Sequence, residues 1–272
     1  MSYPYLSDVV KAVTGVDLPL PLATFGLFVA LAVIGLLILV ASYLLLEETH
    51  HASNRHDGTV TEQLHEIGRL VSDRHFLRYA SISALLGATL FTYISMSSFV
   101  LRDHYGVSPQ AFSLVFATNA VGLVLGSQLN AALVGRFGPA RNLAFGLGVC
   151  TIAAAGLTVA SALGASLAWV LVPLFLVVTS LGGMMANTVA LALTPYGHVA
   201  GGASAVLGSS QFLVGALVPP AVFALSTAAW VMGATMVVTS GLGLLLLVSQ
   251  GASRRPEHSA SAVAAAVSAS TT

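Results

Sequence analysis

The chain has 272 residues, of which 56% are hydrophobic and only 7% are charged, with ten basic and ten acidic side chains. A soluble domain of this length carries about a quarter charged residues, so this chain has too few polar side chains to cover a water-facing surface. The balanced charge argues against a nucleic-acid partner, which calls for a basic excess. The single cysteine, Cys150, excludes an intrachain disulfide, and its apolar surroundings predict that it packs as a small hydrophobe. An all-α integral membrane protein, surrounded by the lipid bilayer, is therefore expected.

Seven segments are long and apolar enough to cross the hydrocarbon core as helices, which takes about 20 residues. Each is apolar over its full length and does not alternate as barrel strands do. The first segment is too long, and too weakly basic at its start, for a cleaved signal peptide, so we interpret it as a retained span. The seven predicted spans are residues 22–46, 77–101, 111–135, 140–163, 167–193, 203–226 and 228–250.

These spans divide the chain into five parts. We expect an extracytoplasmic N-terminal segment at 1–21, the first span at 22–46, a polar cytoplasmic loop at 47–76, a six-helix domain at 77–250, and an Ala/Ser-rich, disordered cytoplasmic tail at 251–272.

The loop at 47–76 predicts a short amphipathic helix. Thr59 and Glu62 fit a capping box, and an apolar stripe follows, made by Leu64, Ile67, Leu70 and Val71. The preceding histidines could suggest a metal site, but no further ligand pattern accompanies them, so we expect neither a metal nor a cofactor. These histidines are His50, His51 and His56.

The distribution of basic residues predicts the orientation, since cytoplasmic loops carry an excess of Lys and Arg. With the N-terminus outside and the C-terminus in the cytoplasm, only Lys11 and Arg102 lie outside. The inside segments then carry Arg55, Arg69, Arg74, Arg78, Arg136, Arg141, Arg254 and Arg255. The stretch LVGRFGPARNL is, on this reading, a tight cytoplasmic turn that reverses at Gly138 and Pro139.

No Asp, Glu, Lys or Arg lies in the central part of any predicted span. Most membrane catalysis uses such a group at depth, so no enzyme activity is expected. Neutral polar residues remain, and a mainly apolar cavity with a few of them suits amphiphilic small molecules. Each could equally be a bridge between helices. The candidate substrate-cavity residues are Tyr93, Ser97, Asn119, Asn187 and Gln211, with Phe91, Phe99 and Phe212 as candidate aromatic walls.

Small residues recur at spacings that let helices approach closely. The candidate helix-packing residues are Gly122, Gly126, Gly201, Gly208 and Gly215. Pro219 and Pro220 lie inside the sixth span, where proline removes a helical hydrogen bond and predicts a kink.

Four phrases occur in order between about Ala30 and Gln250: LLLEETH, TLFTYISMSSFVLRDHYGVSPQAFSLVFATNAVGLVLGSQLNAALVGRFGP, SLGGMMANTVALALTP and GGASAVLGSSQFLVGAL. With these phrases the chain resembles the second half of a major facilitator superfamily transporter, of the Bcr/CflA drug:proton antiporter type. The resemblance implies that the first span is the family's sixth helix and that the next six form its C-terminal domain. It also implies the bacterial cytoplasmic (inner) membrane.

The turn LVGRFGPARNL is similar to the second-half copy of the family's cytoplasmic-loop signature, with Leu133, Arg136, Gly138 and Arg141 at the matching positions. Gly135 stands where the signature prefers an acidic residue, and Pro139 where it has a second basic residue. Ser98 and Ala186 likewise stand where the family has prolines. The family's first five helices, with their proton-carrying carboxylates, have no counterpart in this sequence.

The resemblance implies a half-transporter that exports small molecules by alternating access and needs an N-terminal half, supplied by a separate chain or a second copy. A non-transporting fragment and a membrane scaffold remain open as alternatives. Residues 1–31 faintly resemble the start of prolipoprotein diacylglyceryl transferases. The catalytic signatures of that enzyme do not follow, so its activity is not expected.

Overall fold

The computed structural model describes residues 20–45 and 60–269, and this part of the chain contains helices and no strand. Seven of its helices are long and apolar enough to cross a membrane, which confirms the all-α membrane fold. Each coincides with one predicted span. They are α2 (Leu20–Leu45), α4 (Arg74–Ser98), α5 (Pro109–Phe137), α6 (Pro139–Ala162), α7 (Leu167–Leu193), α8 (Ala200–Leu225) and α9 (Trp230–Ala269).

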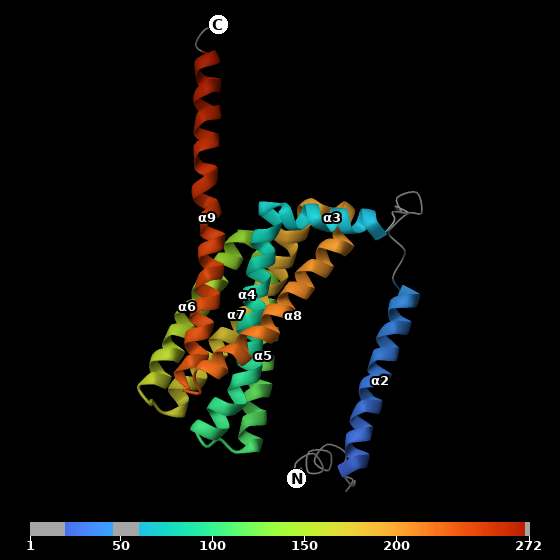
Figure 1. The fold of residues 1–272 in the computed structure, drawn as a ribbon, viewed down its shortest axis with the longest axis vertical. Helices are drawn as coiled ribbons and strands as arrows, with labels where there is room; N and C mark the ends of the chain where they lie inside the picture. Colours follow the sequence, from blue (N-terminus) through green and yellow to red (C-terminus); the bar gives the residue numbers. More distant parts are fainter. Residues whose placement is uncertain (1–19, 46–59, 270–272) are drawn as a thin grey trace. The chain divides into compact units, whose positions relative to one another are not determined.

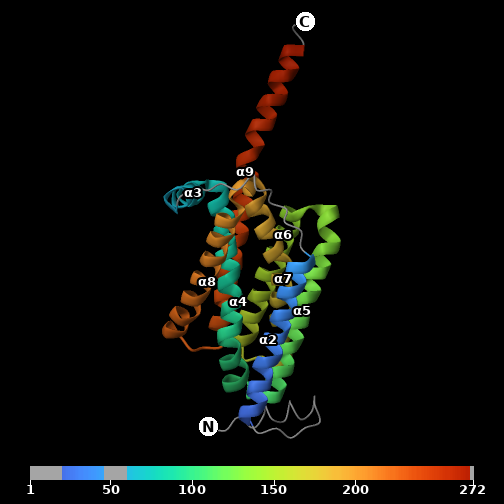
Figure 2. The same cartoon turned by 90° about the vertical axis from the view of Figure 1, so that its right-hand side faces the viewer.

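The chain divides into two compact units, residues 1–58 and 59–272. In the first, the described part is the single apolar helix α2. In the second, six spanning helices form a bundle (Figures 1 and 2). Helix α7 packs on α4, α5 and α6, while α4 also packs on α8 and α9, and α6 packs on α9. Helix α5 is therefore held in the second unit mainly by α7.

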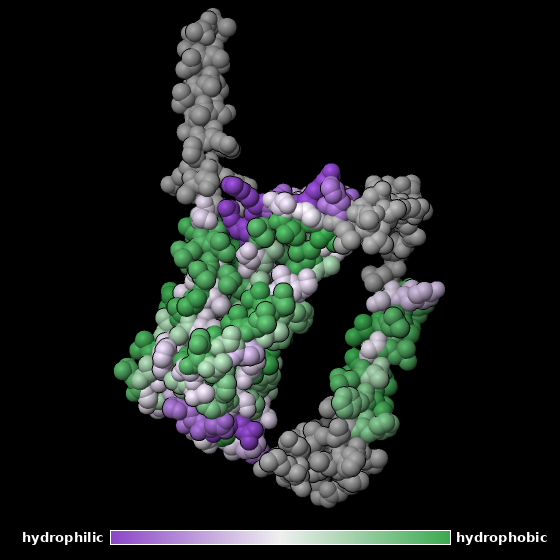
Figure 3. Space-filling model, in the orientation of Figure 1, coloured by the Kyte–Doolittle hydropathy of each residue, from purple (hydrophilic) through white to green (hydrophobic). Residues whose placement is uncertain are grey.

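Hydrophilic residues gather at the two ends of the second unit, and hydrophobic residues cover the belt between them (Figure 3). At one end the helix α3 (Val60–Ser72) lies across the ends of α4 and α8 (Figure 1). Leu70 is buried there, Ile67 is half-buried and Val71 is exposed. The predicted amphipathic helix is thus present, although Thr59 of its capping box and the three loop histidines lie outside the described residues.

At the opposite end, α4 continues directly into the π-helix η2 (Phe99–His104). The wider turn is visible in the backbone bond from the Tyr105 nitrogen to the Val100 carbonyl, 3.2 Å, five residues back. Arg102, Asp103 and His104 are exposed on this turn, so the membrane-spanning part of α4 ends with charged side chains at the surface.

A core of large apolar side chains joins α4, α6, α7 and α9. Its fully buried members include Phe76, Leu86, Leu147, Leu157, Leu174, Leu181, Met184 and Met232. Cys150 on α6 belongs to the same core and has no exposed surface. Its packing agrees with the role of a small hydrophobe that the sequence predicts.

Helix α9 continues to Ala269 and so includes most of the Ala/Ser-rich segment after residue 250. The disordered tail expected there from low complexity stays a prediction. Alanine has the highest helix propensity of all residues, so an alanine-rich segment that directly follows a spanning helix extends it at little cost.

Asp73 caps the N-terminus of α4. Its carboxylate accepts hydrogen bonds from the backbone nitrogens of His75, 2.7 Å, and Phe76, 3.4 Å. The hydroxyl of Tyr196, in the short helix η3 (Thr194–Val199), also donates to it, and this bond is the main reason that the pKa of Asp73 lies below its usual 3.8. The folded protein therefore favours the ionised carboxylate.

We expect Asp73→Ala to destabilise the protein by about 1 kcal/mol at neutral pH, the usual cost of losing an N-cap. Because the folded pKa is lowered, this advantage of the native protein is complete above pH 3.8 and is lost as the pH falls through the folded pKa. Thermal unfolding in detergent at neutral and acid pH measures it. Asp73→Asn is the control, since asparagine caps equally well and does not titrate. An advantage of the native protein over Asp73→Asn that grows as the pH falls would contradict this account.

Candidate functional site

Tyr93 and Asn119 form a buried polar pair between α4 and α5. The amide nitrogen of Asn119 donates to the Tyr93 hydroxyl at 3.2 Å. The Tyr93 ring stacks on Phe116 of α5, with ring centroids 5.3 Å apart and an interplanar angle of 16°. Only 2% of the surface of Asn119 is exposed. The structure thus joins two of the five candidate cavity residues.

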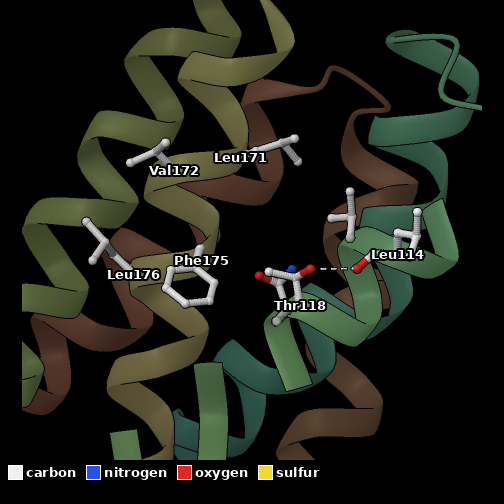
Figure 4. A pocket seen from close by; sticks show the side chains of 8 residues that line it. Leu114, Thr118, Leu171, Val172, Phe175 and Leu176 are labelled. Atoms are coloured by element: carbon white, nitrogen blue, oxygen red, sulfur yellow. Dashed lines mark hydrogen bonds between the residues drawn. The ribbon is translucent and has the colours of Figure 1, made fainter. Parts of the chain in front are cut away.

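A cavity of about 350 Å³ lies beside this pair, between α5 and α7. Leu114, Val115, Thr118 and Asn119 line it from α5, and Leu171, Val172, Phe175 and Leu176 from α7. Figure 4 shows Thr118 facing the ring of Phe175 across the space, while its hydroxyl bonds the Leu114 carbonyl of its own helix at 2.8 Å. The lining is therefore mainly apolar, and the Asn119 amide is a polar group in it that can both donate and accept hydrogen bonds.

The other three candidates lie apart from this cavity. Asn187 bonds to Asn130 of α5, which is 11 residues beyond Asn119 and so about 16 Å further along the helix. Gln211 lies on α8, where its backbone faces Gly87 of α4: a Cβ on that glycine would be 2.5 Å from the Gln211 carbonyl oxygen. Ser97 is buried on α4 without a hydrogen-bond partner for its hydroxyl among the described residues. Of the five candidates, Asn119 alone is among the described residues that line this cavity.

Three asparagines form a network that the sequence analysis did not assemble. Asn187 of α7 donates to the Asn130 amide oxygen at 2.7 Å, and Asn130 donates back at 3.3 Å. Asn142 of α6 donates to the same oxygen at 3.1 Å. The network ties three helices together at one level, so for Asn187 the structure supports the bridging role that the sequence left open. The three asparagines lie on three different helices, so no spacing within one helix signals their meeting.

The candidate aromatic walls pair with α8 from α4 and from η2. Phe91 of α4 meets Phe212 edge-to-face with centroids 5.6 Å apart, and Phe99 of η2 meets Phe223 in the same way at 5.3 Å. These contacts hold α8 against α4 and η2. Pro219 and Pro220 lie near the end of α8, which continues to Leu225.

Glycines allow α5 and α7 to approach closely. A Cβ added to Gly126 would overlap the Thr179 carbonyl oxygen, and one added to Gly122 would lie 2.6 Å from the Phe175 ring. From the α7 side, a Cβ on Gly182 would overlap the Leu123 carbonyl oxygen. Gly182 is not among the packing candidates predicted from the sequence, although it lies within the phrase SLGG.

The remaining packing candidates divide into two groups. A Cβ on Gly215 would lie 2.5 Å from the Phe91 ring, so this glycine permits the contact of α8 with α4. An added Cβ at Gly201 or Gly208 meets no atom of the described residues within 4 Å. Neither of these two glycines is required for a helix contact inside the second unit.

The loop-signature residues lie together at the α5–α6 turn. Gly138 is the single residue between the two helices, and its φ of +79° is a conformation that favours glycine. Pro139 then starts α6, where a missing backbone N–H costs nothing. Leu133 is half-buried, and Arg136 and Arg141 are exposed on either side of the turn. Among the described residues, no three His, Cys, Asp or Glu side chains gather as metal ligands do.

The sequence of the chain is similar to those of known membrane transporters. Residues 18–219 match the family described as Major Facilitator Superfamily. The chain is 34% identical over 236 residues to the protein named "Uncharacterized MFS-type transporter YdgK" of Bacillus subtilis, covering 85% of this chain and 58% of that protein. Two further relatives are each 26% identical. They are the "Bicyclomycin resistance protein homolog" of Haemophilus influenzae, with 79% of this chain and 55% of the relative covered, and "Multidrug resistance protein MdtL" of Shewanella oneidensis, with 90% and 57% covered.

The chain spans just over half the length of these relatives. The family match begins before α2 and extends into α8, so it includes the first spanning helix as well as most of the second unit. Together with the seven membrane-spanning helices, this match identifies a multi-pass membrane protein. The chain belongs to the major facilitator superfamily of membrane transporters.

Proposed function

We propose that this chain is the C-terminal half of a Bcr/CflA-type efflux transporter and supplies one side of a binding site for amphiphilic small molecules. The observation that carries the proposal is the neutral, mainly apolar cavity between α5 and α7, with the hydrogen-bonded Tyr93–Asn119 pair beside it. Pockets of this kind bind ligands through apolar contact, and a few polar groups fix the orientation of the ligand.

Asn119 is the residue best suited to recognise a polar group on such a ligand. Its bond to Tyr93 uses one of the two amide hydrogens, so the amide oxygen and the second hydrogen remain to bind a substrate. The bond and the stacking of Tyr93 on Phe116 hold both side chains in place before a ligand arrives. A preorganised amide binds more tightly than a mobile one, because less conformational freedom is lost on binding.

The names of two relatives favour efflux as the direction of transport. One is called a bicyclomycin resistance protein homolog and the other a multidrug resistance protein. Family membership also accounts for the expectation that the chain is not an enzyme, since its relatives are named as transporters and resistance proteins.

The proposed mechanism is the rocking of two halves around a site near the middle of the membrane. This chain would form one half, and a separate N-terminal half or a second copy would form the other. The partner half would supply the carboxylates that couple transport to protons. We further propose that the α5–α6 turn, with Arg136 and Arg141, faces the cytoplasm of a bacterial cell, as the excess of arginine in these loops indicates.

We expect Asn119→Ala to weaken binding of the transported compound about fivefold, the effect of losing one hydrogen bond of about 1 kcal/mol. The measurement is the accumulation of a fluorescent amphiphilic dye in efflux-deficient bacteria. The strains express the chain alone or together with the N-terminal half of the Bacillus relative. Co-expression should lower dye accumulation, and Asn119→Ala should restore much of it.

Ser113→Ala is the matched control, because Ser113 is exposed on the same helix and its hydroxyl, among the described residues, donates to the Pro109 carbonyl of that helix. It should transport as the unaltered chain does. If transport is unchanged in Asn119→Ala, the site lies elsewhere. If neither expression arm lowers accumulation while both proteins insert into the membrane, the chain is a non-transporting fragment or a scaffold.

A further inference from the structure

Two further cavities lie where α5 and α6 separate, next to the turn that joins these helices. Their volumes are about 260 and 280 Å³, and they share Leu133, Asn142 and Phe145 as lining residues. Helix α7 forms the floor of the first cavity with Leu176 and Met184. We refer to the two cavities together as the α5–α6 groove.

The groove exists because α5 and α6 both pack on α7 and touch each other little. Gly126 and Gly183 line it, and both lie where α5 and α7 approach through their backbones. Helix α7 therefore forms the floor of the groove, and α5 and α6 form its two walls. The groove runs toward the middle of the bundle from the α5–α6 turn, so its axis follows the spanning helices.

The walls of the groove are apolar and exposed. Phe145 is 72% exposed and Leu129 is 59% exposed, and both belong to helices that cross the membrane. Deeper in the groove, the amide of Asn142 donates to Asn130. A flexible hydrocarbon chain fits the α5–α6 groove, since it makes dispersion contacts along the walls and needs no hydrogen bond.

Positive charge is concentrated at the mouth of the groove. Between Ser108 and Thr194 the only charged residues are Arg136 and Arg141, and no carboxylate lies in this segment to pair with them. Both are exposed, and Arg141 lines the outer cavity together with Phe137. The Arg136 guanidinium lies 5.4 Å from the centroid of the Phe137 ring, which holds it beside the same mouth. The N-terminus of α6 adds to the positive potential, since Gly138 offers no side chain to cap it.

We propose that the α5–α6 groove binds an anionic phospholipid, with one acyl chain between α5 and α6 and the phosphate between Arg136 and Arg141. The charge of the mouth and the apolar walls select this occupant together. A zwitterionic lipid would fill the space between the walls but carries no net charge to match two arginines. A free phosphate would match the charge but leave the walls empty. The proposal does not depend on transport.

The test is native mass spectrometry of the purified chain in detergent, titrated with phosphatidylglycerol and, in parallel, with phosphatidylcholine of the same acyl chains. The unaltered protein should retain one phosphatidylglycerol in preference to phosphatidylcholine. A basic residue near an anionic lipid contributes about 1 kcal/mol. Replacing both arginines, as Arg136→Gln with Arg141→Gln, should therefore weaken phosphatidylglycerol binding about 30-fold.

Two further variants separate the parts of the proposal. Arg102→Gln is the matched control, because it removes an exposed arginine at the opposite end of the bundle and should leave the preference unchanged. Val149→Trp fills the first cavity while keeping both arginines, and should weaken binding of the anionic lipid by at least tenfold. Elution of each variant as a monodisperse peak in size-exclusion chromatography checks that it remains folded.

Four results would overturn the proposal. Equal binding of the two lipids would show that the groove does not distinguish an anionic headgroup from a zwitterionic one. An Arg102→Gln effect as large as that of the double variant would show that net charge alone sets the preference. An unaffected Val149→Trp would place the lipid outside the groove, and displacement of the lipid by inorganic phosphate at equal concentration would show that the arginines bind phosphate without an acyl chain.

Discussion

Gly126→Ala is expected to destabilise the protein by about 3 kcal/mol, because the added methyl group would overlap the backbone oxygen of Thr179 on α7. A backbone atom cannot rotate away as a side chain does, so α5 must move off α7 as a whole. Since α5 is held mainly by α7, the move removes most of the contacts that fix this helix. Thermal unfolding in detergent, followed as the loss of monodisperse protein, measures the effect.

Gly135→Ala on the same helix provides the comparison. A Cβ at this position meets no atom of the described residues within 4 Å, and alanine favours a helix by up to about 1 kcal/mol over glycine. This variant should be as stable as the native chain or slightly more stable. Equal melting temperatures for the two variants would mean that α5 and α7 are not in the close contact described above.

Asn130→Ala is expected to cost about 2 kcal/mol, because Asn130 takes part in all three hydrogen bonds of the asparagine network. Measured hydrogen bonds between membrane helices contribute about 0.6 kcal/mol each, so three of them approach this sum. The same unfolding experiment should show a smaller loss for Asn142→Ala, which breaks one bond. Gln128→Ala is the control, since Gln128 is exposed on the same helix.

The network is a unit only if its members act together. The double variant Asn130→Ala with Asn187→Ala should lose less stability than the sum of the two single variants, since the second substitution removes bonds that are already broken. Strict additivity would indicate that each amide is satisfied by other partners, and the description of a shared network would then be wrong.

The spanning helices could be predicted from the sequence because their signal is local. About 20 consecutive apolar residues suffice to identify a span, and α3 was indicated by the spacing of apolar residues such as Ile67 and Leu70 within one short segment. The N-cap at Asp73 makes α4 begin at Arg74, before the predicted range of 77–101, and the π-helix η2 carries the helical segment past that range to His104. Such end effects depend on single side chains and on backbone bonds that hydropathy does not register.

The arrangement of the candidate site was harder to predict because it depends on which helices are neighbours. Tyr93 and Asn119 meet, yet Asn187 lies at another level of the bundle, with Asn130. All are neutral amides or hydroxyls in apolar runs, so the sequence ranks them alike. The packing of the helices decides which of them meet: the Tyr93–Asn119 bond joins α4 to α5. The Asn187–Asn130 bond joins α7 to α5, which approach closely through Gly126 and Gly182.

The complete burial of Cys150 makes the native chain a ready background for distance measurements. Because this is the only cysteine and it has no exposed surface, a water-soluble thiol reagent should modify introduced cysteines and leave it untouched. A pair of spin labels or fluorophores can then be placed on two helices without first removing a native thiol and disturbing the core. Movements of α5 relative to α8 can be followed in this way in the otherwise unaltered protein.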